Sequence, residues 1–264
     1  MNRRAVDMIL IDTHCHIHDL DYGILPEETL AHAHANHVDK MITIGTTLEN
    51  SLLAQDFCAR HSEVFFTLGY HPHEYPDQGH ATPTEVHRVV EQFELANSQL
   101  FDDSKLVAIG EIGLDYHYAP YNREIQIALL ESMLQIAQNH NLPVSFHVRD
   151  AFDDFWPIFD NFHLPISVLH SFSDNETRLE QGLNRGLYIG VNGLSTFAKL
   201  PHAPLDRIIL ETDAPYLTPK PFRGTINRPG YIYNIAEWAA QSYQVTLDEV
   251  AKITTQNAEK LFKI

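Results

Sequence analysis

Eight short apolar runs alternate with helical patterns along almost the whole chain, and this alternation limits the possible folds more than any other feature. The runs are too continuously apolar for half-exposed strands of an antiparallel sheet, so they are typical of buried parallel strands. Two capping boxes, Thr82–Glu85 and Thr246–Glu249, mark helix starts. We expect strands at 8–11, 40–46, 64–70, 106–110, 143–146, 166–169, 187–191 and 207–212. We expect helices at 26–37, 49–61, 82–96, 122–140, 152–161 and 176–185, a loop at 221–229 after the last strand, and helical structure through the rest.

The simplest architecture for this pattern is an α/β fold of the TIM-barrel type, a (β/α)8 barrel. The alternative is a doubly wound open sheet, which would bring residues from the first, fourth and eighth strands around one centre less easily. The 264 residues show no internal repeat, low-complexity stretch or linker. We therefore expect a single domain that covers residues 1–264.

The composition excludes several classes of function. A formal net charge of −17 argues against a broad basic face for nucleic acid, so cations for a polyanionic substrate must be recruited locally. Cys15 and Cys58 are too few for a disulfide framework, which suits a reducing cytosol. The apolar run at 8–11 is too short for a signal-peptide core, and no stretch is long and apolar enough to span a membrane. We expect a cytoplasmic monomer with no obligate protein partner.

Metal-competent side chains follow the predicted strands. His14 and His16 end the first strand, and side chains two apart in a strand point the same way, so both can reach one ion. Active-site groups of (β/α)8 barrels lie at these carboxyl ends. Four imidazoles and two carboxylates exceed what one ion needs and predict a two-metal centre with one carboxylate bridging. The six candidates are His14, His16, Glu111, His147, His170 and Asp213.

The chain resembles the TatD-type metal-dependent deoxyribonucleases of the amidohydrolase superfamily. The resemblance rests on IDTHCH, TLGYHPHE, VAIGEIGLDYHY, LPVSFHVRDA, SVLHSFSD, LYIGVNGLSTF, ILETDAPYLTP and TTQNAEKLF, which cover nearly the whole chain in order. It implies one metal held by His14, His16 and Asp213. It also implies a second metal held by His147 and His170, with Glu111 bridging the two.

The same resemblance implies roles in catalysis and substrate binding. Asp213 would orient or deprotonate the attacking water, and His71 would contact the scissile phosphate or act as an acid. Substrate contacts are expected from four residues at family positions: Arg149, Arg223, Asn227 and Arg228. The chain departs from the common family sequence at three positions. Asp174 stands where the family usually has glycine, Ile226 where a basic residue is frequent, and Arg228 where an acid is frequent. These departures affect the expected substrate preference.

Other residues are singled out by position alone. Glu211 lies two before Asp213 on the same strand face and is placed to hydrogen-bond a liganding histidine. Asp12 bears the same relation to His14, with a structural salt bridge as the alternative. Aromatic side chains near strand ends could stack on unpaired bases or pack at the barrel rim. They are Tyr70, Tyr116, Tyr118 and Phe172.

Three functions remain open at this point. The first is a nuclease that uses two divalent ions (Mg2+, Mn2+ or Zn2+) to cleave single-stranded or frayed DNA from an end, as an exonuclease does. Paired ions would activate a water and offset the charge of the phosphodiester. The second is a hydrolase of a small phosphoester, lactone or amide, since fold and metals alone do not name a substrate. The third is a non-catalytic metal-binding protein, which would not need Asp213.

Overall fold

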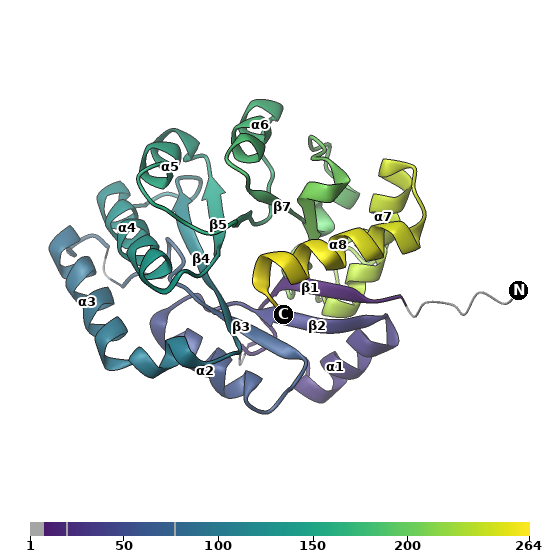
Figure 1. Cartoon of the computed structure of the whole chain (residues 1–264), viewed down its shortest axis with the longest axis horizontal. Helices are drawn as coiled ribbons and strands as arrows, with labels where there is room; N and C mark the ends of the chain where they lie inside the picture. Colours follow the sequence, from purple (N-terminus) through teal and green to yellow (C-terminus); the bar gives the residue numbers. More distant parts are fainter. Residues whose placement is uncertain (1–7, 20, 77) are drawn as a thin grey trace, which may run out of the picture.

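In the part of the chain that the structure describes, eight parallel strands follow one another in chain order. They curl into a nearly closed barrel with helices outside (Figure 1). The computed structural model describes residues 8–19, 21–76 and 78–264. The strands are β1 (Leu10–Cys15), β2 (Val38–Thr43), β3 (Val64–Leu68), β4 (Leu106–Asp115), β5 (Val144–Arg149), β6 (Val168–Leu169), β7 (Tyr188–Val191) and β8 (Ile208–Leu210). This sequential order confirms the TIM-barrel prediction and excludes the doubly wound sheet, whose strand order reverses at a switch point.

The outer layer consists of helices that follow the strands. They are α1 (Pro26–Ala35), α2 (Leu48–Cys58), α3 (Pro83–Ala96), α4 (Arg123–His140), α5 (Phe152–Phe159), α6 (Glu176–Asn184), α7 (Ile232–Tyr243) and α8 (Leu247–Phe262). Short 3-10 turns occur at Ser98–Asp102, Gly193–Thr196, Leu205–Arg207 and Pro229–Tyr231. Both predicted capping boxes are confirmed, at the starts of α3 and α8. Within the described residues, no helix combines the length and apolar character that crossing a bilayer requires.

The barrel closes between β1 and the residues after β8. The backbone N–H of Asp213 donates to the carbonyl of His14 over 2.8 Å, and the N–H of His16 donates to the carbonyl of Ala214 over 2.8 Å. The two bonds alternate along the chains as in a parallel ladder. The seam of the barrel therefore runs through three of the predicted metal ligands.

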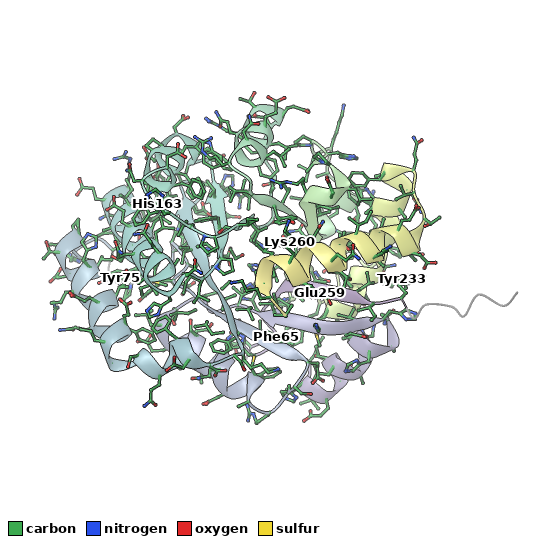
Figure 2. The ribbon with its side chains drawn as sticks, in the orientation of Figure 1. Phe65, Tyr75, His163, Tyr233, Glu259 and Lys260 are labelled. Carbon is green, nitrogen blue, oxygen red and sulfur yellow. The ribbon has the colours of Figure 1, made fainter. Side chains whose placement is uncertain are left out.

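One end of the barrel is sealed by the C-terminal helix. Apolar side chains that point into the barrel, such as Ile11 and Ile209, pack with Leu261 and Phe262 of α8. In Figure 1 the end of α8 lies across the ring of strands. In Figure 2, Phe65 of β3 lies on this face with Glu259 and Lys260 of α8. Because this end is filled, the opening lies at the other end, where the strands have their carboxyl termini.

The structure corrects two predicted segments. Strand β2 begins at Val38 and ends at Thr43 instead of spanning 40–46, because Leu10 pairs with Val38 and Thr47 already caps α2. Apart from a loop at 221–229, the stretch after the last strand was expected to be helical, but residues 213–228 form no helix. Prolines at 215, 219 and 221 explain this difference, since each lacks an N–H donor and fixes its own φ.

Strand β4 is twice as long as predicted and contains two glycines that no larger residue could replace. Gly110 and Gly113 have φ values of 149° and 157°. A Cβ on Gly113 would overlap the carbonyl oxygen of His147 on the neighbouring strand. The glycines let β4 approach β5 closely and continue past Glu111, so Glu111 and His147 come to face each other.

We predict that Gly113→Ala lowers the free energy of unfolding by about 2 to 4 kcal/mol, because the added methyl group both strains φ and displaces β5. Urea denaturation followed by circular dichroism measures the change. Gly79→Ala is the matched control, since a Cβ there meets no atom within 4 Å. Equal stability of the two variants would contradict this account of the β4–β5 contact.

Candidate metal centre

A cleft of about 710 Å³ opens at the carboxyl ends of the strands. Its walls include His16, His71, Glu111, His147, His170 and Asp213. His14 lies just behind this wall and is fully buried. The six predicted ligands and His71 thus come from β1, β4, β5, β6 and the loops after β3 and β8 to one place, as the barrel geometry requires.

Among the described residues, three groups place their ligand atoms within 4.8 Å of one another. His14, His16 and Asp213 form one group, which is the set that the family resemblance assigns to one ion. Glu111 belongs to both of the others, with His14 and His170 in one and with His71 and His147 in the other. A carboxylate shared by two groups fits the predicted bridging role. The resemblance did not include His71 among the ligands, but its ring lies in the group of His147.

Glu111 lies at the centre of the cluster. Its Oε1 atom is 2.7 Å from Nδ1 of His147 and 3.7 Å from Nε2 of His170, and its Oε2 atom is 3.5 Å from Nε2 of His14. Asp213 faces it from the other side, with Oδ1 3.4 Å from Nε2 of His16. Its φ is 59°, a left-handed conformation that non-glycine residues adopt mainly where surrounding contacts hold them. The seam hydrogen bond to His14 supplies such a contact.

The buried imidazole of His14 lacks a hydrogen-bond partner in the described part of the chain, which indicates a binding site for a metal ion. The rings of His14 and His170 stack with centroids 3.4 Å apart. Neither ring nitrogen of His14 has a hydrogen-bond partner among the described residues, although both are buried. An unpaired buried polar atom is costly, and a divalent ion accepting a lone pair would remove that cost. The donor set of imidazoles and carboxylates is one that such ions accept.

Glu211 lies against the back of His170, as its spacing from Asp213 predicts. Its Oε1 atom is 3.0 Å from Nδ1 of His170 and accepts a hydrogen bond of 2.6 Å from the N–H of Ser171. Gly190 leaves room for this carboxylate, because a Cβ there would overlap it. We propose that Glu211 orients His170 so that Nε2 points into the cluster.

Asp115 does the same for His147, and the sequence reasoning missed it. Its Oδ2 atom is 2.9 Å from Nε2 of His147, and its backbone is held by both ends of the buried Gln126 amide. Nε2 of His73 lies 3.5 Å from its other oxygen. The signal was present, since Asp115 lies four residues after Glu111 on the same face of a strand. It was missed because β4 was expected to end at Gly110.

Asp12 has a structural role. Its carboxylate accepts hydrogen bonds from the N–H and hydroxyl of Thr212, at 2.8 and 2.5 Å, and from the N–H of His14 at 3.3 Å. It therefore ties β1 to the residues after β8, and among the described residues it pairs with no cation. Burial raises the pKa of Asp12 to about 8, against the opposing effect of these hydrogen bonds.

The charges of the cluster are strongly coupled. Burial works against ionisation of Glu111, but the surrounding imidazoles outweigh it and hold the pKa well below its usual range. Burial likewise opposes protonation of His147 and His170, yet the adjacent carboxylates raise their pKa values to about 9 and about 10. His71 is different: burial lowers its pKa to about 3, so the ring is neutral and free to donate a lone pair.

The predicted substrate residues do not all reach the cleft. Arg149 lines it and, among the described residues, pairs with no carboxylate. Arg223 lies 4.0 Å above the ring of Phe197, and Arg228 pairs with Glu28 over 3.0 Å. Asn227 is fully buried and donates to the carbonyls of Thr212 and Tyr216, so it holds the loop after β8 in place.

The structure also shows where two of the residues that depart from the common family sequence, Ile226 and Asp174, lie. Ile226 is 46% exposed on the same loop. An exposed apolar side chain therefore stands where a basic residue is common in the family. The carboxylate of Asp174 accepts a hydrogen bond of 2.6 Å from the N–H of Asn175, which in turn caps α6. Asp174 thus stabilises the turn after His170 where the family usually has glycine.

Comparison with known proteins decides the family. The model of TatD-related DNases matches residues 11–263. The chain belongs to the TatD-related DNase family. A metal-dependent hydrolase of Bacillus subtilis, YabD, is 31% identical over 97% of this chain and all of its own length. The 3'-5' ssDNA/RNA exonuclease TatD of Citrobacter rodentium is 32% identical over 90% of this chain and 92% of its own.

Solved structures agree with this placement. The TatD homologue YJJV of Escherichia coli superimposes with a TM-score of 0.81 at 28% identity, covering 97% of this chain and 98% of its own. A TatD family hydrolase of Entamoeba histolytica gives the same TM-score at 22% identity, which supports the fold alone. This TatD-family chain is a metal-dependent hydrolase, and the interpretation as a non-catalytic metal-binding protein is set aside.

We predict that metal affinity rises with pH, because binding must displace protons from His147 and His170. Both rings are protonated below their pKa values of about 9 and about 10 in the metal-free protein. The association constant should rise about tenfold per pH unit for each proton displaced. Titration calorimetry with Mn2+ between pH 6 and 8, in buffers of different ionisation enthalpy, measures both affinity and proton release. A pH-independent affinity would exclude these two rings as ligands.

We predict that Asp115→Asn weakens metal binding about 10- to 100-fold, because an amide orients and polarises the ring of His147 less well than a carboxylate. Equilibrium dialysis against Co2+ with its visible spectrum measures affinity and ligand geometry together. Asp160→Asn is the control, since Asp160 pairs with Arg185 on the outer surface. Unchanged affinity and spectrum in Asp115→Asn would refute the orienting role.

Proposed function

We propose that this protein is a deoxyribonuclease that holds two divalent ions, Mg2+, Mn2+ or Zn2+, and shortens single-stranded or frayed DNA from an end. The observation that carries the proposal is the cleft itself. It combines three overlapping groups of ligand atoms with Arg149, which lines the cleft and pairs with no carboxylate among the described residues. The exonuclease name of the Citrobacter relative supports a nucleic-acid substrate.

We assign the ions to this chain's residues in two positions. His14, His16 and Asp213 would hold one, and Glu111 would share a second with His147, His170 and, from its position, His71. Such ions, when bound, acidify water and offset negative charge on a phosphodiester. Asp213, at the edge of the cleft, is the carboxylate placed to accept a proton from the attacking water. Arg149 is placed to hold a phosphate oxygen at the opening.

We also propose that the protein acts in the cytoplasm. Cys15 and Cys58 are both buried and unpaired, as is usual for proteins of reducing compartments.

The proposal that the substrate is single-stranded agrees with the shape of the site. A recessed cluster at the bottom of a cleft is reached more easily by a flexible strand than by an intact duplex.

A second candidate is a hydrolase of a small phosphoester, lactone or amide. The charge of the cleft favours it, because the lining includes Asp19, Glu74, Glu111 and Asp213 but Arg149 is its one arginine or lysine among the described residues. Long-range attraction of a polyanion by such a surface is weak. A small substrate would need no such attraction.

We predict that the metal-stripped protein, given Mg2+, Mn2+ or Zn2+, shortens a single-stranded oligonucleotide from one end. Asp213→Ala should lower the rate by about 10²- to 10⁴-fold, the usual contribution of a proton-transfer group. Glu111→Ala should lower the rate at least as far, because it removes the carboxylate that the ions would share. Gels with 5′- and 3′-labelled strands measure rate and polarity. Asp160→Asn is the surface control, and circular dichroism verifies that the variants fold.

Two outcomes would contradict the proposal. Cleavage by Asp213→Ala at the wild-type rate would exclude the proton-accepting role of Asp213. Hydrolysis of p-nitrophenyl esters or lactones, with every oligonucleotide left intact, would favour the second candidate.

A further inference from the structure

We propose that Tyr118 and Tyr216 form a stacking subsite for unpaired nucleobases on either side of the metal centre. This proposal rests on the proposed nuclease function. It specifies which part of the substrate the site recognises, namely the exposed face of an unpaired base. Both side chains line the cleft, and they are 59% and 61% exposed. Exposed tyrosine rings at a cleft mouth are apolar surface that a bound planar group would cover.

Tyr216 stands at one end of the cluster. It follows Asp213 closely, and its N–H donates to the carbonyl of Asp213 over 2.7 Å. Its own carbonyl accepts from the buried Asn227 amide, so its backbone is held from both sides. The ring centroid lies 6.0 Å from that of His16. A base on this ring would lie beside the group formed by His14, His16 and Asp213.

Tyr118 stands at the other end of the cluster. It follows β4, and its ring lies 6.2 Å from that of His73, which approaches Asp115. The guanidinium carbon of Arg149 is 4.9 Å from the ring centroid. The guanidinium covers one face of this ring, so a base would stack on the other face while the guanidinium takes the adjacent phosphate.

Other aromatic side chains near the strand ends already have partners inside the protein. Tyr70 packs on Tyr75, and the hydroxyl of Tyr116 donates to Asp154 while its ring stacks on Tyr121. Phe172 is buried against Phe152. These three follow the rim-packing interpretation. In contrast, the hydroxyl groups of Tyr118 and Tyr216 form no hydrogen bond to any described residue. The ring of Tyr118 does contact His117 edge-on, with centroids 4.8 Å apart, but 59% of this side chain and 61% of Tyr216 stay exposed and available to a ligand.

The two tyrosines account for strand selection without a basic groove. In a duplex the faces of the bases are covered by their neighbours, whereas a single strand can offer them to an aromatic ring. Stacking tolerates any base sequence because every base has a π face. The subsite therefore selects unpaired strands through an uncharged interaction, which agrees with a net charge of −17.

The test compares Tyr118→Ala and Tyr216→Ala with the conservative variants Tyr118→Phe and Tyr216→Phe. Substrates are a single-stranded oligonucleotide and the same strand with abasic residues in its last positions. We expect the alanine variants to lower kcat/KM on the normal strand about 5- to 100-fold, mainly through KM. The phenylalanine variants should keep wild-type values, and the abasic strand should be cut poorly and equally by all five proteins.

The outcomes separate the subsite from the nuclease function. If the wild type cuts the normal strand but the alanine variants lose nothing, or lose as much on the abasic strand, the stacking subsite is overturned and the function stands. If no protein cuts either strand, the nuclease function fails. Quenching of a 2-aminopurine oligonucleotide then decides the subsite: quenching that disappears in both alanine variants supports it, and quenching that does not depend on the tyrosines overturns it.

Discussion

The seam between β1 and the residues after β8 is the contact on which the site depends. The hydrogen bonds that close it involve the backbones of His14, His16 and Asp213, whose side chains form the first ligand group. Asp12, tucked behind the seam, binds Thr212 and keeps the two segments in register. The contacts that close the barrel therefore also bring these three side chains together, and a change that opened the seam would separate them.

Charge is the second constraint on this centre. Surrounding imidazoles outweigh burial and lower the pKa values of Glu111 and Asp213, while the pKa of His147 is raised by Asp115 and Glu111 and that of His170 by Glu211 and Glu111. Opposite charges are thus paired in the metal-free protein, and a divalent cation that binds these rings would displace their protons. Asp115 and Glu211 remain behind the rings as hydrogen-bond acceptors in either state.

Much of the fold followed from periodicity, and the six ligand candidates followed from residue type at the predicted strand ends. Buried parallel strands are continuously apolar, so their ends could be located, and a barrel brings such ends together. Local rules worked less well where the chain is irregular. The fourth strand was expected to end at Gly110, whereas Gly110 and Gly113 permit the close approach to β5 with which the strand continues to Asp115. The loop after β8 could not be placed either, because its course depends on the buried amide of Asn227.

The amino-acid sequence by itself determined the barrel, the six ligand candidates and the family, because these depend on residue type and on spacing along single strands. Tertiary structure alone decided which side chains face the cleft. It placed Arg149 there and directed Arg228 to Glu28, and it left Tyr118 and Tyr216 exposed while packing Tyr70 and Tyr116. The physical reason is that exposure and pairing depend on neighbours from distant segments, and no local pattern carries that information.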